Sequence, residues 1–279
     1  MIVHAAAPVH ARTAPPAAAA GEPGRRLPLY LYGRAATQVG VDGPALLVRR
    51  ADKAPARYPF SRLARVVSGA GVEWTARALA ACIEHDLPIV FLDRAGQPAG
   101  YLHAAQTKPS RLDDLLTQLL DRPDGLDRYA LWLRHERMHV LRAWRAERTA
   151  VGADVGEDEY RELVRRHVYR EETGPLGLAG EHLYLGAVSA YAIDQIQRAG
   201  IRPLYWGLHG QPLRLADDLA DLLALDLSLR LRGLGEAARG DDAALLTVLH
   251  AYGQGLTERC RCTLGRLHRH LSETLDEWR

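Results

Sequence analysis

The stretch "ARVVSGAGVEWTARALAACIEHDLPIVFLDRAGQPAGYL", residues 64–102, changes its hydrophobic pattern several times and decides the fold of the N-terminal part. The run "ARVVS" predicts a strand. Thr75 is a suitable N-cap for a helix over "ARALAACIEHD". "LPIVFLD" is typical of a buried strand, and the glycines of "RAGQPAGYL" indicate a hairpin. The predicted order is therefore strand, helix, strand and hairpin.

Three shorter runs precede this stretch. "LPLYLYG", "TQVGVDG" and "ALLVRR" are brief apolar or alternating segments, and glycines punctuate them. This pattern predicts adjacent strands with tight turns, followed by a loop at "YPFSR". We therefore expect residues 27–105 to form a small β-rich domain with one helix.

The periodicity changes at about residue 111, where apolar residues begin to recur at i, i+3 and i+4. The short polar segment "HAAQTKPS" marks the boundary, and residues 111–279 are expected to form a larger all-helical domain. The predicted fold class is α+β. Helices are expected over "RLDDLLTQLLD", "DRYALWLRHERMHVLRAWRAER", "DEYRELVRRHVYRE", "EHLYLGAVSAYAIDQIQRAG", "ADDLADLLALDLSLRLRGL", "DDAALLTVLHAYGQGL" and "RCRCTLGRLHRHLSETLDEW".

Composition limits the possible functions only broadly. The chain has 36 basic and 34 acidic residues, so its net charge of +2 does not by itself indicate a nucleic-acid-binding protein. Three cysteines suit a reducing cytoplasm better than a disulfide framework. No apolar stretch approaches the roughly 20 residues of a membrane span. Residues 1–26 are rich in alanine and proline and are expected to be a disordered leader.

The segment "GLHGQPLRLADDLAD", residues 207–221, combines a histidine in a glycine-flanked turn with two aspartates on a predicted helix. Asp218 and Asp221 share one helical face, because positions i and i+3 are neighbours. Two partly buried carboxylates repel each other, and a divalent cation removes that cost. With His209, this donor set suits Mn²⁺ or Mg²⁺. The alternative is a helix whose first turn is acidic because the helix dipole favours it.

Residues 181–226 and 64–102 together resemble the CRISPR-associated spacer-acquisition integrase family, the larger protein of the CRISPR adaptation complex. That family has a Gly-x-x-Pro element, a turn with a glycine shortly before a histidine, and an Asp-x-x-Asp helix. It also has a threonine that opens a helix and a Leu-Asp pair before a glycine turn. The matching residues are Gly200 with Pro203, Gly207 with His209, Asp218 with Asp221, Thr75, Leu92 with Asp93, and Gly96.

The resemblance implies a DNA transesterification in which a 3′-hydroxyl attacks a phosphodiester at the CRISPR repeat boundary, and cutting of branched DNA as the reverse reaction. It implies that His209 and Asp218 bind Mg²⁺ or Mn²⁺, with Asp221 binding the metal or holding another ligand. It also implies a homodimer formed through the β-rich domain, bridged by a dimer of a small second adaptation protein. The DNA partners would be the double-stranded spacer precursor and the CRISPR repeat.

The family's catalytic helix also supplies a glutamate, as Glu-Gly, and no Glu-Gly occupies the expected place here. Glu159 is our choice for this catalytic and metal-binding role, because Leu163 and His167 follow it on one helical face. Glu157, Glu162 and Glu136 remain alternatives; Glu136 has Val140 and Trp144 at matching offsets, but lies on a helix that better matches the one before the motif.

DNA is expected to be held through its phosphates by arginines. The candidates are near the proposed metal residues in the sequence: Arg161, Arg165, Arg166, Arg230 and Arg232. Arginines on an exposed helix can equally form a plain solvated face.

Three rival functions stay open. The absent Glu-Gly favours a catalytically silent relative that acts as a DNA-binding scaffold. The dipeptide His85-Asp86 occurs in a class of metal-dependent phosphohydrolases, although its place before a strand favours a polar turn. A purely structural helical module is the third, and it requires that His209, Asp218 and Asp221 can be replaced without loss.

Overall fold

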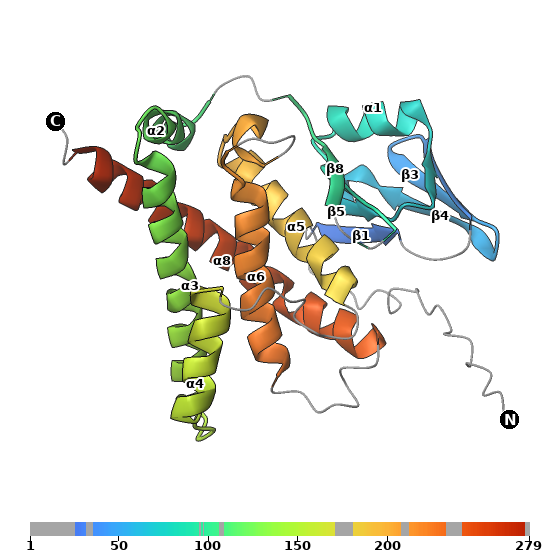
Figure 1. Cartoon of the computed structure of the whole chain (residues 1–279). Helices are drawn as coiled ribbons and strands as arrows, with labels where there is room; N and C mark the ends of the chain where they lie inside the picture. The colour runs from blue at the N-terminus through green and yellow to red at the C-terminus, as the bar shows by residue number, and fades with distance from the viewer. Residues whose placement is uncertain are drawn as a thin grey trace, which may run out of the picture.

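The structure of the protein is a computed structural model that describes residues 26–31, 36–94, 96, 98–105, 109–170, 181–207, 212–232 and 242–276, without the side chains of 181–185, 187 and 242–254. Strands occupy the N-terminal part, and the elements from residue 111 onward are helical (Figure 1). The predicted α+β class, with a β-rich part before a larger helical part, is confirmed.

The first sheet has the strand order β1-β5-β7-β8 and lies against the helical part. Its strands are β1 (Leu27–Leu31), β5 (Leu63–Ser68), β7 (Ile89–Leu92) and β8 (Pro98–Leu102). β1, β5 and β7 are parallel, and β8 returns antiparallel to β7. Val66 and Val67 are adjacent and both fully buried, so β5 is covered on both faces.

The second sheet has the order β4-β3-β2-β6. Its strands are β2 (Thr37–Asp42), β3 (Ala45–Arg50), β4 (Lys53–Pro59) and β6 (Val72–Trp74). The expected loop at "YPFSR" is wrong at its start, because Tyr58 and Pro59 belong to β4. β4 is an edge strand of mostly exposed residues with two prolines, so it lacks the apolar run by which buried strands are found.

Helix α1 (Ala76–Glu84) begins as predicted, with Thr75 Oγ1 accepting the Ala78 N–H at 3.2 Å. Ala78 and Cys82 are fully buried on the face that packs into the sheet core. The next two residues form the predicted polar turn. His85 stacks on Phe60 at 4.2 Å, and Asp86 accepts a hydrogen bond from Gln197 at 2.9 Å. Both residues of the His-Asp dipeptide therefore make structural contacts.

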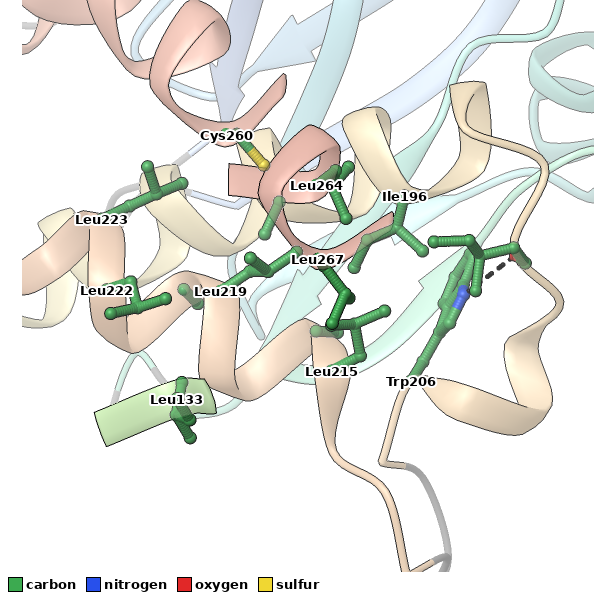
Figure 2. Packing of buried hydrophobic residues seen from close by; sticks show 14 of the residues in the cluster. Leu133, Ile196, Trp206, Leu215, Leu219, Leu222, Leu223, Cys260, Leu264 and Leu267 are labelled. Atoms are coloured by element: carbon green, nitrogen blue, oxygen red, sulfur yellow. Dashed lines mark hydrogen bonds between the residues drawn. The ribbon is translucent and has the colours of Figure 1, made fainter. Parts of the chain in front are cut away.

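Helix α6 (Leu215–Leu231) is the centre of the helical part (Figure 1). It packs against α3, α5 and α8, and its apolar side chains meet theirs in one core (Figure 2). Burial on all sides explains why α6 has leucine or alanine at so many of its positions. The other helices are α2 (Arg111–Leu120), α3 (Gly125–Ala150), α4 (Glu157–Leu163) with a π-helical turn at Val164–Val168, α5 (Glu181–Arg198) and α8 (Asp242–Asp276).

The last two predicted helices are wrong as separate elements, because α8 is one helix of 35 residues. Gly253 and Gly255 suggested a break between them. A glycine inside a helix costs only about 1 kcal/mol relative to alanine. Cys260, Leu264 and Leu267 of α8 are buried in the main core (Figure 2), and this packing offsets the cost.

Helix α5 joins the sheet to the helical core. Val67, Val90 and Leu92 of the sheet form a buried cluster with Ala190 of α5. Beside it, the buried Arg65 of β5 pairs with the buried Asp194 of α5 at 3.2 Å. The interface between the two parts is therefore apolar around one enclosed ion pair, and it fixes α5 and the loop that follows it.

Candidate active site

The loop that connects α5 to α6 is held in place from its first residue. Gly200 has φ +70°, and the Ile201 N–H donates to the Ile196 carbonyl at 3.2 Å, which ends α5 in a glycine-terminated turn. Arg202 then donates its backbone N–H and its Nε to the fully buried carboxylate of Asp113, at 2.8 and 2.7 Å. The Gly-x-x-Pro element is thus tied to α2.

The aromatic residues that follow, Tyr205 and Trp206, also fix the loop between α5 and α6. Trp206 Nε1 donates to the Ile201 carbonyl at 3.2 Å (Figure 2), and the hydroxyls of Tyr205 and Thr117 are 2.6 Å apart. Gly207 has φ +97°, and a Cβ there would lie 2.7 Å from Cα of Arg214. Only glycine fits this close approach. Gly207 and Arg214 therefore lie close together at the start of α6, and His209 lies outside the described residues.

Asp218 lies in the first turns of α6 and is half-buried. Its carboxylate accepts a hydrogen bond from the Tyr129 hydroxyl of α3 at 3.0 Å. Burial raises the pKa of Asp218, the Tyr129 hydrogen bond lowers it, and the charge of Asp221 raises it further. The resulting pKa is above the ordinary value of an aspartate. Ionised Asp218 therefore makes the folded protein less stable.

Asp221 follows one turn later, as predicted from the spacing. Arg170 Nη2 donates to Asp221 Oδ2 at 2.8 Å, and both side chains are about half exposed. Burial raises the pKa of Asp221, and the charges of Arg170 and Arg137 oppose that shift. Arg170 comes directly after the π-helical turn, and its φ of +54° is unusual for a residue other than glycine.

Arg137 of α3 is the second cation at this site, and its side chain is buried. Burial lowers its pKa and the nearby Arg170 lowers it further, whereas Asp218 and Asp221 raise it. The two aspartates therefore lie between two guanidinium groups. Half-buried carboxylates with raised pKa values suit Mg²⁺ or Mn²⁺ as oxygen donors, and the two residues that can supply them here are Asp218 and Asp221.

The structure does not bring Glu159, the predicted third carboxylate, together with Asp218 and Asp221. Glu159 is exposed at the start of α4, and its Oε1 lies 3.8 Å from Nη1 of Arg232, which caps the C-terminal end of α6. Arg232 comes fourteen residues after Asp218, which corresponds to about 20 Å along the helix axis. Helix α4 runs antiparallel to α6, so its beginning meets the far end of that helix. Among the described residues, no group of three His, Cys, Asp or Glu side chains could hold a metal ion.

The three alternative glutamates also have partners. Glu157 pairs with Arg145 at 3.1 Å, and Glu162 pairs with Arg166 at 3.3 Å, both at the surface. Glu136 is different, because it is buried on α3, the helix that supplies Tyr129 and Arg137 to the site. It accepts hydrogen bonds from Nε and Nη2 of Arg266 of α8, the shortest at 2.6 Å.

The five predicted DNA-binding arginines fall into two groups. Arg230 is largely enclosed, with hydrogen bonds to Glu147 at 2.7 Å and to Asp226 at 3.3 Å, so its guanidinium already has protein partners. Arg232 is more exposed and pairs with Glu159. The remaining three lie on the exposed face of α4 and its π-helical turn, in ion pairs with acidic residues of the same segment: Arg161, Arg165 and Arg166.

Sequence reasoning missed three residues of the site: Tyr129, Arg137 and Arg170. Tyr129 and Arg137 are eight residues apart on α3, which is a same-face spacing that could have been noticed. Nothing local indicates that this face meets Asp218. Arg170 approaches Asp221 across 51 residues of sequence. Only the packing of three helices brings these groups together.

The comparisons with known proteins agree with this architecture. Residues 29–124 match the family model described as CRISPR associated protein Cas1. A Cas1 protein from Thermotoga maritima has a TM-score of 0.62 at 14% identity, covering 88% of this chain and 97% of the other. Two further structures each cover 88% of this chain and 91% of theirs: a TtCas1–DNA complex, with a TM-score of 0.56 and 16% identity, and a casposase bound to an integration product, with 0.54 and 12%. No curated protein matches the chain.

The structural likenesses establish the fold, and the family model matches the sequence over residues 29–124. None of the described helices is both long and apolar enough to cross a membrane. The Gly200–Pro203 element, the glycine turn at residue 207 and the Asp218–Asp221 helix occur in the order that the sequence predicted. Together with the match of residues 29–124 to the Cas1 model and the fold shared with Cas1 structures, these features support assignment of the chain to the Cas1 family.

Proposed function

We propose that the chain is an integrase of CRISPR adaptation that joins spacer DNA to the CRISPR array by metal-dependent transesterification. The observation that carries this proposal is the Asp218–Asp221 pair, half-buried on α6 beside two arginines and directly after the loop closed by Gly207. Carboxylates with adjacent cations suit a reaction at a phosphodiester, which needs both metal ligands and charge stabilisation.

In this proposal His209 and Asp218 hold Mg²⁺ or Mn²⁺, and Asp221 binds it directly or holds a neighbouring ligand. When bound, the cation lowers the pKa of an attacking 3′-hydroxyl and neutralises charge on the phosphorane. Tyr129 orients Asp218 by donating its hydroxyl hydrogen to that carboxylate. Arg137 is buried beside both aspartates and supplies fixed positive charge.

Glu136 is the fourth ligand that we propose; it forms no metal-binding group with Asp218 and Asp221 in this structure, so the role requires its side chain to move. It is the one that lies buried on α3, next to Arg137, and the same helix meets α6 at Tyr129. Binding a metal requires that Glu136 leaves Arg266, with which it is paired at 2.6 Å. Glu159 has no part in this assignment, because it lies at the other end of α6.

The proposed partners are double-stranded DNA, a second copy of the chain and a dimer of Cas2. One structure of the same fold is a complex of TtCas1 with DNA, and another is a Cas6-RT-Cas1–Cas2 complex, with a TM-score of 0.55. The proposed phosphate contacts lie on the exposed face of α4 and its π-helical turn: Arg161, Arg165 and Arg166. Binding through such contacts should weaken steeply as salt rises.

A strand-transfer assay on branched DNA tests the proposal, with Mn²⁺, with Mg²⁺ and with chelator. We expect joining that needs metal and is lost in His209→Ala. Glu136→Gln and Glu159→Gln form a matched pair, and the structure predicts that only the first reduces joining. Joining that persists in His209→Ala or in chelator would contradict the proposed chemistry, and equal loss in the two glutamine variants would contradict the assignment of Glu136.

A catalytically silent scaffold is the second candidate, and one observation favours it. Each described carboxylate considered for the metal site has a protein partner: Tyr129 for Asp218, Arg170 for Asp221 and Arg266 for Glu136. DNA binding without joining in any metal, in the presence of the second adaptation protein, would support this candidate.

A further inference from the structure

We propose that Arg170 is an internal counter-ion that competes with the divalent cation for Asp221 and, once displaced, binds the DNA backbone. The inference rests on the proposed function and adds a positioning residue that sets metal affinity. It begins with the 2.8 Å hydrogen bond from Arg170 Nη2 to Asp221 Oδ2. An oxygen that accepts a charge-assisted hydrogen bond at this distance is not freely available to a metal ion.

The backbone at Arg170 shows that this contact is built into the fold. Its φ of +54° is costly for a residue with a Cβ. The residue before it, Tyr169, lies under the guanidinium of Arg134 at 5.7 Å, and the π-helical turn at Val164–Val168 packs on α3. The backbone therefore places Arg170 beside Asp221, while its half-exposed guanidinium keeps the freedom to leave that carboxylate.

The charges at the site explain why a bound divalent cation would displace an arginine. Asp218 and Asp221 carry two negative charges, and Arg137 and Arg170 carry two positive charges. A divalent cation added to this balanced set leaves two positive charges in excess. Repulsion between the cation and the guanidinium groups is then relieved when one arginine moves away.

Arg170 is the arginine that can move. Arg137 is buried within α3 and α6, with 9% of its surface exposed. The Arg170 side chain is 52% exposed and lies at the end of a helical segment. A displaced guanidinium beside a metal-bound phosphodiester is well placed to donate to a phosphate oxygen, which guanidinium geometry suits. Metal binding and DNA binding should therefore be coupled through Arg170.

Calorimetric titration of the full chain with MnCl₂, without DNA, measures the first part of this inference. We expect Arg170→Gln to bind Mn²⁺ about tenfold more tightly than the native chain, because one competing charge is gone. Arg170→Lys, which keeps the charge, should stay within about threefold of the native affinity. The matched control is Arg57→Gln, which breaks an exposed Arg–Asp pair with Asp42 in the second sheet and should leave the affinity unchanged.

Binding of a branched DNA duplex with Mn²⁺ present measures the second part, and Arg170→Gln should weaken it several-fold. Circular dichroism melting confirms that each variant is folded. Mn²⁺ affinity that is unchanged or lower in Arg170→Gln overturns the inference and leaves the proposed function intact. Tighter Mn²⁺ binding by Arg170→Gln, together with native protein that never joins DNA, supports the counter-ion role and overturns the proposed function. Absence of Mn²⁺ binding by both proteins overturns both.

Discussion

The two ends of α6 each place aspartates among arginines, but they differ in how completely the charges are paired. At the C-terminal end, Asp226 is buried between Arg230 at 3.3 Å and Arg259 at 2.8 Å, and Glu147 closes the group. At the N-terminal end, Asp218 accepts from a neutral tyrosine, and Asp221 is half exposed. A closed ion network holds helices together, whereas a partly paired one retains the capacity to bind something else.

The largest effect should come from the N-terminal end of α6, around Asp218 and Asp221, which we call the open end because its charges are only partly paired; the C-terminal end, around Asp226, is the closed end. Asp218→Asn keeps the shape and the acceptor for Tyr129 but removes a charge that a divalent cation needs. We expect strand transfer to fall at least about a hundredfold, because metal charge stabilisation is worth several kcal/mol. Asp217→Asn is the control, since Asp217 pairs with Arg214 at 2.7 Å at the surface and should affect joining little. Equal losses of strand transfer in Asp218→Asn and Asp217→Asn would contradict a specific role for Asp218.

The closed end should show the next largest effect, and it should appear in stability. Arg230→Met removes one of the two arginines that pair with Asp226 and Glu147, and Arg259 remains. We expect a loss of about 2 kcal/mol in the free energy of unfolding, below the roughly 3–5 kcal/mol of a fully broken buried pair, because Asp226 keeps one cation. Arg232→Met, at an exposed pair, should cost less than about 1 kcal/mol. Urea denaturation measures both.

DNA binding by the same two variants sharpens the comparison. The folded fraction of Arg230→Met should bind DNA like the native chain, because the Arg230 side chain is only 13% exposed and occupied by Glu147 and Asp226. A several-fold loss of DNA affinity in this variant, with native-like stability, would restore Arg230 to the DNA surface and would contradict a structural role.

A third effect concerns the loop that leads into the open end. Gly207→Ala places a Cβ 2.7 Å from Cα of Arg214, at a φ of +97°. We expect a loss of about 2 kcal/mol in unfolding free energy from the strained backbone, together with reduced strand transfer. Gly43→Ala, at a φ of +57° with open space around it, is the control: it should cost less and leave joining unchanged. An innocuous Gly207→Ala would show that the loop does not need this close approach.

The sequence was informative where chemistry follows from local spacing. Periodicity separated the β-rich part from the helical part, Thr75 was found as an N-cap, and the Asp218–Asp221 spacing placed two carboxylates on one helical face. Each of these depends on residues within one or two turns. The unpredicted strand β4 is the counterexample, because an exposed edge strand has little hydrophobic pattern to detect.

The partners of the site could not be found in the same way. Glu159 was chosen for its helical face, but a helical face does not tell which end of a neighbouring helix it meets. The antiparallel course of α4 and the π-helical turn decide that Arg170, and not Glu159, reaches the aspartates. Arg230 likewise has the sequence context of a surface cation and becomes enclosed when α3 and α8 pack around α6.

The smallest effect is a pH-dependent difference in stability. It tests whether ionised Asp218 lowers the free energy of unfolding. Burial raises the pKa of Asp218 in the folded chain above its unfolded value, so ionised Asp218 destabilises the fold at neutral pH. Asp218→Asn should therefore be more stable than the native chain at pH 7.5 without metal, because it removes the charge whose burial is unfavourable.

This advantage should shrink as the pH falls through the folded pKa of Asp218 and disappear below the unfolded value of about 4. Melting temperatures of the two proteins from pH 7.5 to pH 4 measure it. Added Mn²⁺ should reverse the order at neutral pH, because it stabilises the native carboxylate by binding the folded state. A variant that is less stable than the native chain without metal would show that Tyr129 and Arg137 already compensate Asp218 fully. The charges at the N-terminal end of α6 would then be as fully compensated as those around Asp226. The argument that Asp218 and Asp221 bind a metal because their charges are incompletely compensated would no longer hold.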